Sequence, residues 1–293
     1  MKEIKILAVI IGLVAVTYYG IEPYAHHVMH PEPAPVDFKF SDLKNVDTSL
    51  VGNAERGKGQ FEANCIACHA AEKAGYPAMM SDADSAASYG VVPPDLSMAG
   101  HLYETNFLAN FIFDPVSATH LSHKYPEGGA KVHPMPSYNW MPAQDIMDIV
   151  AFLKSIPKET FASESEEHRA DFISACGRCH SMAYAGIEAR TPSDTLKAYI
   201  GAAAPDLSQY IKSRGHEYLE NFINDPQRLL HGTGMPRVGL TKEAQEHIVE
   251  YMEEIGDSKK AEREDLGWKV MLYMLVFAIF ATLWKNKLWR EVH

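Results

Sequence analysis

The hydrophobic positions of this chain gather in two runs, one near each terminus. Ile6 to Ile21 contains no charged residue, and Leu266 to Trp284 contains a single lysine. A spanning helix needs about 20 apolar residues, so the second run is long enough and the first is slightly short. Interfacial tyrosines and snorkelling lysines make up the difference. We therefore predict a membrane anchor at residues 1–22 and a transmembrane helix at residues 266–286.

Basic residues flank both runs on the side of the chain's ends. By the positive-inside rule, this pattern predicts that both termini are cytoplasmic and that the region between them lies in the periplasm, beside a bacterial inner membrane. A signal peptide removed after export is the alternative for the first run, but Ala15-Val16-Thr17 is a poor cleavage site, so we expect a retained anchor. The basic residues are Lys2, Lys5, Lys285, Lys287 and Arg290.

Between the two runs, apolar positions recur with a helical period. Polar, helix-favouring stretches occupy residues 53–64 and 163–175, and an amphipathic segment closes each half of this region. No alternating pattern of useful length predicts a strand, so the expected fold class is all-α. The apolar faces of the closing segments consist of Ile146, Ile149, Val150 and Leu153, and of Ile248, Val249, Met252 and Ile255.

The region between the runs is an internal repeat, and this decides the architecture. Pro-Asp-Leu-Ser at 94–97 recurs at 205–208, an offset of 111 residues, whereas Met-Pro at 135–136 recurs at 235–236, an offset of 100. The first copy therefore carries eleven extra residues between Pro115 and Met135. We name this stretch the inserted loop and expect it to be a surface loop. The two predicted domains are the first repeat, residues 50–156, and the second repeat, residues 163–256.

The four cysteines form two Cys-x-x-Cys pairs, and a histidine follows each pair directly. Two thiols at this spacing bind one porphyrin covalently, and the next imidazole then reaches the iron, as in c-type haem attachment. A lone Cys-x-x-Cys more often indicates zinc or dithiol redox chemistry, but the added histidine inside a repeat favours haem. We expect two covalently bound haem c groups, which must be attached after export. The haem-binding cysteines are Cys65, Cys68, Cys176 and Cys179, and the iron ligands are His69 and His180.

A second axial ligand must come from elsewhere in each repeat, and a methionine thioether is favoured because it stabilises ferrous iron. Met235 stands between a glycine and a proline, shortly before the last predicted helix of its repeat, and Met135 is its repeat partner. Most methionines only pack in the core, so the choice of these two ligands rests on their equivalent positions in the two repeats. A His/Met pair leaves no open position on the iron, which favours electron transfer over chemistry on a ligand. Met135 is preferred to Met98, Met141, His120, His123 and His133.

The net charge of the chain is −11 with histidine counted neutral. Such an imbalance repels nucleic-acid phosphates and either attracts a basic partner or only keeps the surface solvated. Nucleic-acid binding is therefore not expected.

With these motifs in place, each repeat resembles the class I cytochrome c domain: an attachment motif on the first helix, a Pro-x-Leu segment, Met-Pro and a terminal helix. The resemblance covers residues 50–256. It implies that Pro94 and Pro205 offer their backbone carbonyls to the axial histidines, a bond that orients the imidazole. Without the resemblance, both prolines are ordinary turn residues.

The whole layout resembles the dihaem subunit that takes the place of cytochrome c1 in some bacterial quinol:cytochrome c oxidoreductases (bc1 complexes). Two fused cytochrome domains followed by a membrane helix with a basic tail carry this resemblance. It implies an electron-transfer subunit that is not catalytic alone, with a cytochrome b, a Rieske iron-sulfur donor and a soluble periplasmic cytochrome c as partners. The usual c1 has a single haem and loses its N-terminal signal, so the order of electron flow between two haems stays open.

Two other functions stay open. The dihaem subunit of a cbb3-type cytochrome c oxidase also has two such domains, but its anchor is N-terminal. A dihaem peroxidase-like enzyme needs an open or displaceable ligand at one iron, so an absorption band for methionine ligation at both haems would exclude it. The subunits that accompany the protein in its native membrane distinguish the oxidase from the bc1 complex.

Overall fold

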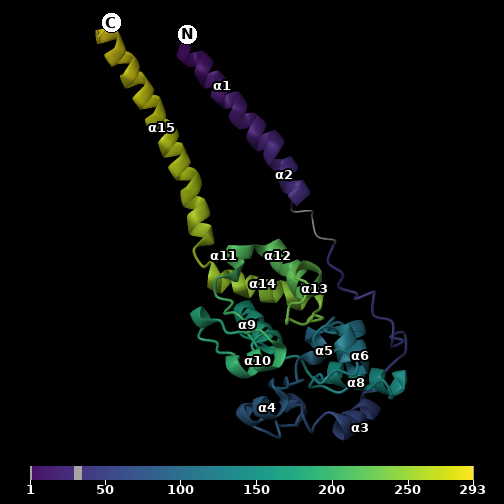
Figure 1. Cartoon of the computed structure of the whole chain (residues 1–293). Helices are drawn as coiled ribbons and strands as arrows, with labels where there is room; N and C mark the ends of the chain where they lie inside the picture. The colour runs from purple at the N-terminus through teal and green to yellow at the C-terminus, as the bar shows by residue number, and fades with distance from the viewer. Residues whose placement is uncertain (1, 30–34, 293) are drawn as a thin grey trace. The chain divides into compact units, whose positions relative to one another are not determined.

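The computed structural model describes residues 2–29 and 35–292. The chain forms two compact units, Met1–Asp37 and Phe38–His293. In the described residues the regular structure is helical, and only isolated β-bridges occur beside it (Figure 1). The predicted all-α fold class is therefore confirmed.

The first unit is one long helix that contains a π-helical turn. It consists of α1 (Lys2–Val16), η1 (Thr17–Ile21) and α2 (Glu22–Met29). Pro23 follows η1 and has no N–H to donate to the helical ladder. A π-turn accommodates such a break without ending the helix. The helix therefore runs beyond residue 22, where the anchor was predicted to end.

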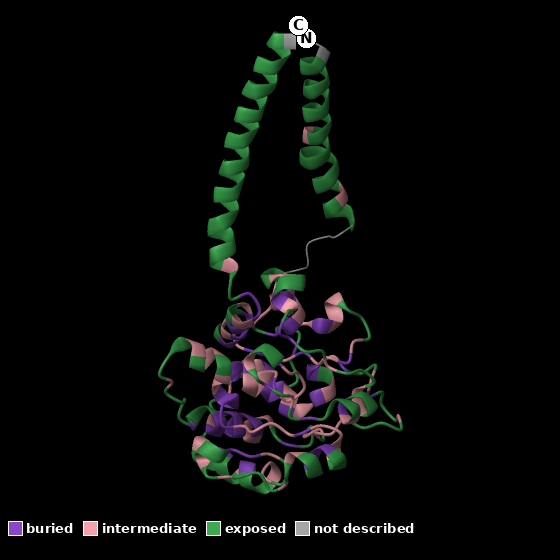
Figure 2. Cartoon of the chain, turned by 90° about the vertical axis from the view of Figure 1, so that its left-hand side faces the viewer, coloured by how far each residue is buried: buried purple, intermediate pink, exposed green. Residues whose placement is uncertain are grey.

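Among the described residues, two helices are long and apolar enough to cross a membrane. They are Glu3–Met29 in the first unit and Lys260–Glu291 within α15 (Lys260–Val292). Neither buries its apolar segment against the rest of the protein, and the green colouring of Figure 2 shows this exposure. Both helices fall where the hydrophobic runs predicted membrane segments.

The second unit contains the same series of elements twice, followed by α15. Each series has a long helix, a 3₁₀ turn, four shorter helices and a long closing helix. In the first repeat these are α3 (Ala54–Asn64), η2 (Glu72–Ala74), α4 (Asp82–Tyr89), α5 (Ala99–Leu102), α6 (Thr105–Phe113), α7 (Pro115–Ala118) and α8 (Ala143–Ser155). In the second repeat they are α9 (Glu164–Ala175), η3 (Ala183–Ala185), α10 (Ser193–Ile200), α11 (Tyr210–Arg214), α12 (His216–Asn224), α13 (Pro226–Leu229) and α14 (Lys242–Gly256).

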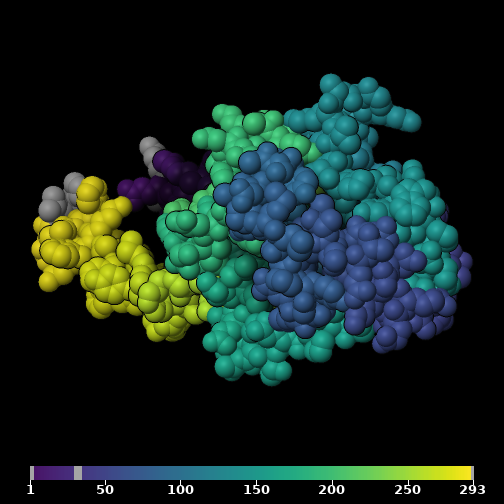
Figure 3. Space-filling view, turned by 90° about the horizontal axis from the view of Figure 1, so that it is seen from below, coloured from purple at the N-terminus to yellow at the C-terminus, as the bar shows by residue number. Residues whose placement is uncertain are grey.

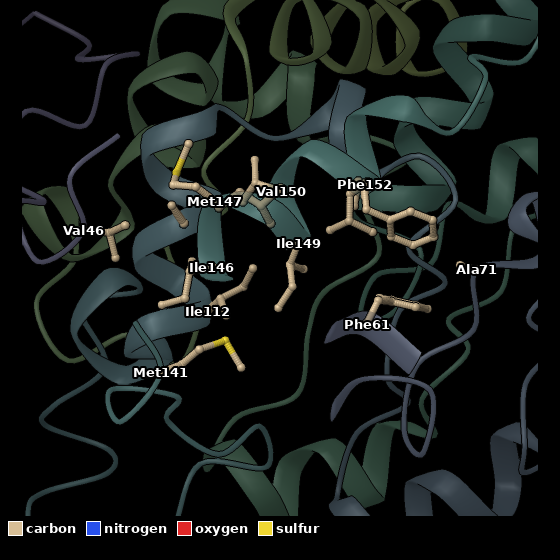
Figure 4. Packing of buried hydrophobic residues seen from close by; sticks show 14 of the residues in the cluster. Val46, Phe61, Ala71, Ile112, Met141, Ile146, Met147, Ile149, Val150 and Phe152 are labelled. Carbon is tan, nitrogen blue, oxygen red and sulfur yellow. The ribbon is translucent and has the colours of Figure 1, made fainter. Parts of the chain in front are cut away.

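Helices α3 and α8 pack together to form the core of the first repeat. Phe61 of α3 is fully buried, and its ring centroid lies 5.2 Å from that of Phe152 on α8 (Figure 4). Gly57 lets the two backbones meet, because a Cβ at this position would lie 1.8 Å from the carbonyl oxygen of Asp148. The close approach of these helices therefore depends on the missing side chain of one glycine.

Asp148 of α8 ties the start of α3 to α8 through a buried carboxylate. Its Oδ1 accepts a 2.7 Å hydrogen bond from the N–H of Asn53, which caps α3, and a 2.9 Å bond from Nε2 of Gln144. Arg56 of α3 donates from Nε to Oδ2 at 2.6 Å and from Nη2 to Oδ1 at 3.0 Å. The bonds from Arg56, opposed by burial and aided by the other donors, lower the pKa of Asp148 to about 2.

We expect Asp148→Asn to destabilise the protein by about 2–3 kcal/mol at neutral pH, because the charge-assisted bonds are lost while the site stays buried. Since the folded-state pKa is depressed, the stabilisation by the carboxylate is complete above about pH 4 and is lost as the pH falls toward 2. Denaturant titrations between pH 7 and 3 measure both effects. Glu55→Gln on the exposed side of α3 is the control, and an equal loss in this control would contradict the assignment.

Where Gly57 approaches Asp148 in the first repeat, the second repeat has two histidines. His168 on α9 and His247 on α14 occupy the repeat positions of Gly57 and Asp148. Their rings stack with centroids 4.3 Å apart, and Nδ1 of His247 lies 2.8 Å from Oδ2 of the buried Asp171. At these two positions, the equivalent helices thus meet through stacked side chains in the second repeat and through a direct backbone approach in the first.

The two repeats share a boundary inside the second unit. In Figure 3, the blue surface of the first repeat meets the green surface of the second. Leu102 of α5 is buried in the core cluster of the second repeat, and Tyr103 packs against the clusters of both. The carbonyl of Leu102 accepts a 3.0 Å bond from the N–H of Thr241. A side chain of the first repeat thus belongs to the core of the second.

The inserted loop also lies on this boundary. Its Leu121 and Tyr125 are buried, and the ring centroid of Tyr125 lies 5.8 Å from that of Tyr199 on α10. The hydroxyl of Tyr199 donates a 2.7 Å bond to the carbonyl of Val132. The expectation of a surface loop is therefore wrong for Leu121 and Tyr125, which are buried, and right for most of the other loop residues, which are exposed.

Candidate functional site

Each Cys-x-x-Cys-His motif forms a tight turn at the end of its helix. In the first repeat, the N–H of Cys65 donates to the carbonyl of Phe61 at 2.8 Å. The N–H groups of Cys68 and His69 then donate to the carbonyl of Cys65 at 3.1 and 2.9 Å. The equivalent distances in the second repeat are 2.8, 3.0 and 2.9 Å. The turn therefore gathers two thiols and an imidazole at one end of α3, and again at one end of α9.

The thiols of both motifs are free, and no disulfide joins them. Burial, with a smaller contribution from the neighbouring cysteine, raises the pKa of Cys65 and of Cys176 to about 12, so these two thiols are protonated at neutral pH. Within the described parts of the chain, no three His, Cys, Asp or Glu side chains are grouped so that they could hold a metal ion. Thiolate redox chemistry and a cysteine-rich zinc site therefore gain no support from this geometry.

The imidazoles of both motifs bond to the predicted prolines. Nδ1 of His69 lies 3.0 Å from the carbonyl oxygen of Pro94, and Nδ1 of His180 lies 2.8 Å from that of Pro205. A carbonyl only accepts hydrogen bonds, so Nδ1 carries the proton and Nε2 keeps its lone pair. Burial lowers the pKa of both histidines, which favours the neutral imidazole. Each ring is thus held in the tautomer that an iron ligand needs.

The two predicted methionines border the same cores as the motifs. Met135 and Cys65 pack against the core cluster of the first repeat, and Met235 and Cys176 pack against that of the second. All four are partly buried. The backbone N–H of Met135 lies 3.2 Å from Nδ1 of His133, which fixes the start of the Met-Pro turn. One thioether therefore accompanies each set of two thiols and one imidazole.

The other methionines and histidines considered as ligands have different surroundings. Met141 is buried in the core cluster of the first repeat, and Met98 is buried with the Nζ of Lys73 3.6 Å from its sulfur. His120 lies 3.3 Å from a carboxylate oxygen of Asp225, and His123 bonds to a carbonyl of the second repeat. These side chains are engaged in packing or in contacts between the repeats.

Sequence reasoning missed Arg237, which stands two residues beyond Met235. This arginine is buried, and its guanidinium donates two bonds of 2.8 and 3.0 Å to the carboxylate of Asp42. It also lies over the ring of Phe40, 4.6 Å from the centroid, and its N–H donates to the carbonyl of Thr119. The loop that carries Met235 is therefore anchored outside its own repeat. The sequence shows only a charged residue directly after a Met-Pro pair, and this does not indicate a buried anchor until the fold is known.

The chemistry of this donor set fits haem c. Each repeat offers two thiols for thioether bonds, an imidazole with a free Nε2, and a thioether at the edge of an apolar cluster. Nitrogen and sulfur ligands of this kind hold a low-spin haem iron in electron carriers. The residues that would hold the groups are Cys65, Cys68, His69 and Met135 in the first repeat, and Cys176, Cys179, His180 and Met235 in the second.

Comparison with known proteins gives a family match for the first repeat. Residues 54–157 match the family model for cytochrome c, so this segment is a cytochrome c domain, a type that carries covalently bound haem c and transfers electrons. The match covers the first repeat and none of the second. No curated protein matches the chain. One similar solved structure, described as "Hyperthermophilic respiratory Complex III", is 25% identical, covers 46% of this chain and 80% of that chain, and gives a TM-score of 0.35.

Proposed function

We propose that the protein is a membrane-anchored dihaem cytochrome c that carries electrons, with one haem c in each repeat. One observation carries this proposal: the bond from the motif histidine to a proline carbonyl occurs twice, at 3.0 Å in the matched domain and at 2.8 Å in the second repeat. A histidine that only fills space does not need this bond. Because the bond recurs in the second repeat, it supports the assignment of a second haem there.

The residues of each site perform distinct tasks in this proposal. The two cysteines tether the haem, which supplies one-electron redox chemistry when bound. The proline carbonyl orients the imidazole, and the methionine would supply the second iron ligand; in the second repeat, Arg237 holds the loop that carries it. An imidazole and a thioether on the same iron would leave no position for a substrate, so the sites would relay electrons and perform no reaction on a ligand.

We further propose the role of cytochrome c1 in a quinol:cytochrome c oxidoreductase. Two helices apolar enough to cross a membrane support anchoring at both ends, with the haem repeats in the periplasm between them. A Rieske protein would then be the electron donor, a cytochrome b the membrane partner, and a soluble cytochrome c the acceptor. The net charge of −11 suits an acceptor with a basic docking surface.

Counting haems tests the proposal that there are two. We expect mass spectrometry and pyridine haemochrome assays of the native chain to give two haem adducts. Replacing both cysteines of either motif with alanine should reduce the count to one, and replacing all four should reduce it to none. A wild-type count of one would contradict the dihaem assignment, whatever the variants do.

Purification of the protein from its native membrane in mild detergent tests the proposed complex. Cytochrome b and a Rieske protein in stoichiometric amounts are the expected companions. Haem-copper oxidase subunits in their place would instead identify the chain as the dihaem subunit of a cbb3-type oxidase.

A further inference from the structure

Two adjacent residues of the second repeat bind the peptide links inside its own haem motif. The N–H of Arg190 donates a 3.0 Å bond to the carbonyl of Gly177, and the N–H of Thr191 donates a 3.0 Å bond to the carbonyl of Arg178. Gly177 and Arg178 are the two residues between the motif cysteines. The segment 190–191 is therefore fastened to the attachment turn of the second haem.

The side chains of the same two residues reach into the first repeat. Arg190 donates from Nε and Nη2 to the carboxylate of Asp82, at 2.9 and 2.7 Å, where α4 begins. The Oγ1 of Thr191 accepts a 3.1 Å bond from the N–H of Val92, shortly after α4 ends. The ion pair of Arg190 is about half exposed and contributes little. Thr191 is 1% exposed and Val92 2%, so their bond is shielded from water.

Val92 leads directly to the proline that orients the first axial histidine. Pro94 follows it by two residues and accepts the bond from His69. Three hydrogen bonds thus connect the two motifs. The N–H of Thr191 donates to the Arg178 carbonyl at 3.0 Å, and the N–H of Val92 donates to Oγ1 of Thr191 at 3.1 Å. The third bond joins Nδ1 of His69 to the Pro94 carbonyl at 3.0 Å. The orientation of the first imidazole is therefore supported by the attachment turn of the second haem.

The first repeat has no counterpart to the pair Arg190 and Thr191. Met79 and Met80 occupy the repeat positions of Arg190 and Thr191, and their side chains carry neither a guanidinium nor a hydroxyl. The bond from Val92 to Thr191 therefore has no symmetric counterpart at Met80, and the first repeat contacts the second site elsewhere, where the Thr119 carbonyl accepts from the backbone N–H of Arg237.

We propose that Thr191 is a positioning residue that couples the two haem sites, holding the Pro94 loop so that the orientation of His69 depends on the second attachment motif. The inference rests on the proposed function, because it needs a haem at each site. The boundary between the repeats thus positions a haem ligand in addition to stabilising the fold. Arg190 supports the same segment from the start of α4.

The test is Thr191→Val in the full-length, haem-loaded protein. Valine keeps the shape of threonine but leaves the N–H of Val92 without its acceptor. We expect the ferric EPR signal of the first haem to shift its g values, and the midpoint potential of that haem to move, while the second haem keeps both. Thr191→Ser retains the hydroxyl and should restore the wild-type signal.

A second variant separates this coupling from general loosening of the boundary. Tyr199→Phe removes the bond to the Val132 carbonyl, which also joins the two repeats but does not lead to Pro94. Its EPR spectrum should match the wild type. Unchanged signals in Thr191→Val, or equal changes in Tyr199→Phe, would overturn the inference. Both outcomes are read in protein that already shows two haems, so they are distinct from a failure of the proposed function.

Discussion

Replacement of Met235 with histidine is expected to lower the midpoint potential of the second haem and to abolish the methionine-to-iron charge-transfer band of that haem. A thioether stabilises ferrous iron, whereas a second imidazole favours the ferric state. Axial ligands and their surroundings set haem potentials over about 0.8 V, so the change should be large compared with the error of a redox titration. Optical titration combined with near-infrared absorption measures both quantities.

The same change at Met135 should act on the first haem alone. Met98→Leu and Met141→Leu are the matched controls, because both methionines are buried and both were considered as ligands from the sequence. These two variants should keep the near-infrared bands of both haems. Loss of a band in Met141→Leu, with the band retained in Met135→His, would show that the repeat alignment chose the wrong sulfur.

Replacement of Gly57 with alanine is expected to destabilise the protein by about 3 kcal/mol or more, at the upper end of overpacking effects. The new Cβ would lie 1.8 Å from the Asp148 carbonyl oxygen and 2.3 Å from its carbon. A backbone group cannot rotate away as a side chain can, so α3 must separate from α8. Because α3 carries the first attachment turn, the absorbance of the first haem should report the change during thermal unfolding.

Gly59 offers a control on the same helix. An added Cβ there meets nothing within 4 Å. Gly59→Ala should therefore stabilise the protein slightly, by up to about 1 kcal/mol, since alanine favours a helix more than glycine does. Equal melting temperatures for the two alanine variants would contradict the proposed backbone contact.

Local patterns in the sequence were sufficient for the long helices of each repeat, whereas the short helices between them were not predicted. The amphipathic segments predicted α8 and α14, and the polar stretches before each motif became α3 and α9. The contacts between the two prolines and the histidines were implied by the resemblance, and both span the same 25 residues of sequence. The methionine ligands stay a prediction that the proposed variants test.

The boundary between the repeats was beyond sequence reasoning. Thr191 and Val92 are 99 residues apart, and neither stands in a pattern that marks a contact. The inserted loop was expected at the surface because its glycines, prolines and histidines resemble turn sequences. Its buried Tyr125 instead packs near Tyr199. Such contacts follow from how two whole domains pack, and no local periodicity encodes them.

The burial of Leu102 in the core of the second repeat bears on how the protein matures. This side chain belongs to the first repeat, yet it is 2% exposed within the second repeat's cluster. Every chain is synthesised from its N-terminus, so Leu102 is made before the second repeat. The second repeat completes its core with a side chain of the first, and we expect the second repeat expressed alone to be less stable than the same repeat in the full chain.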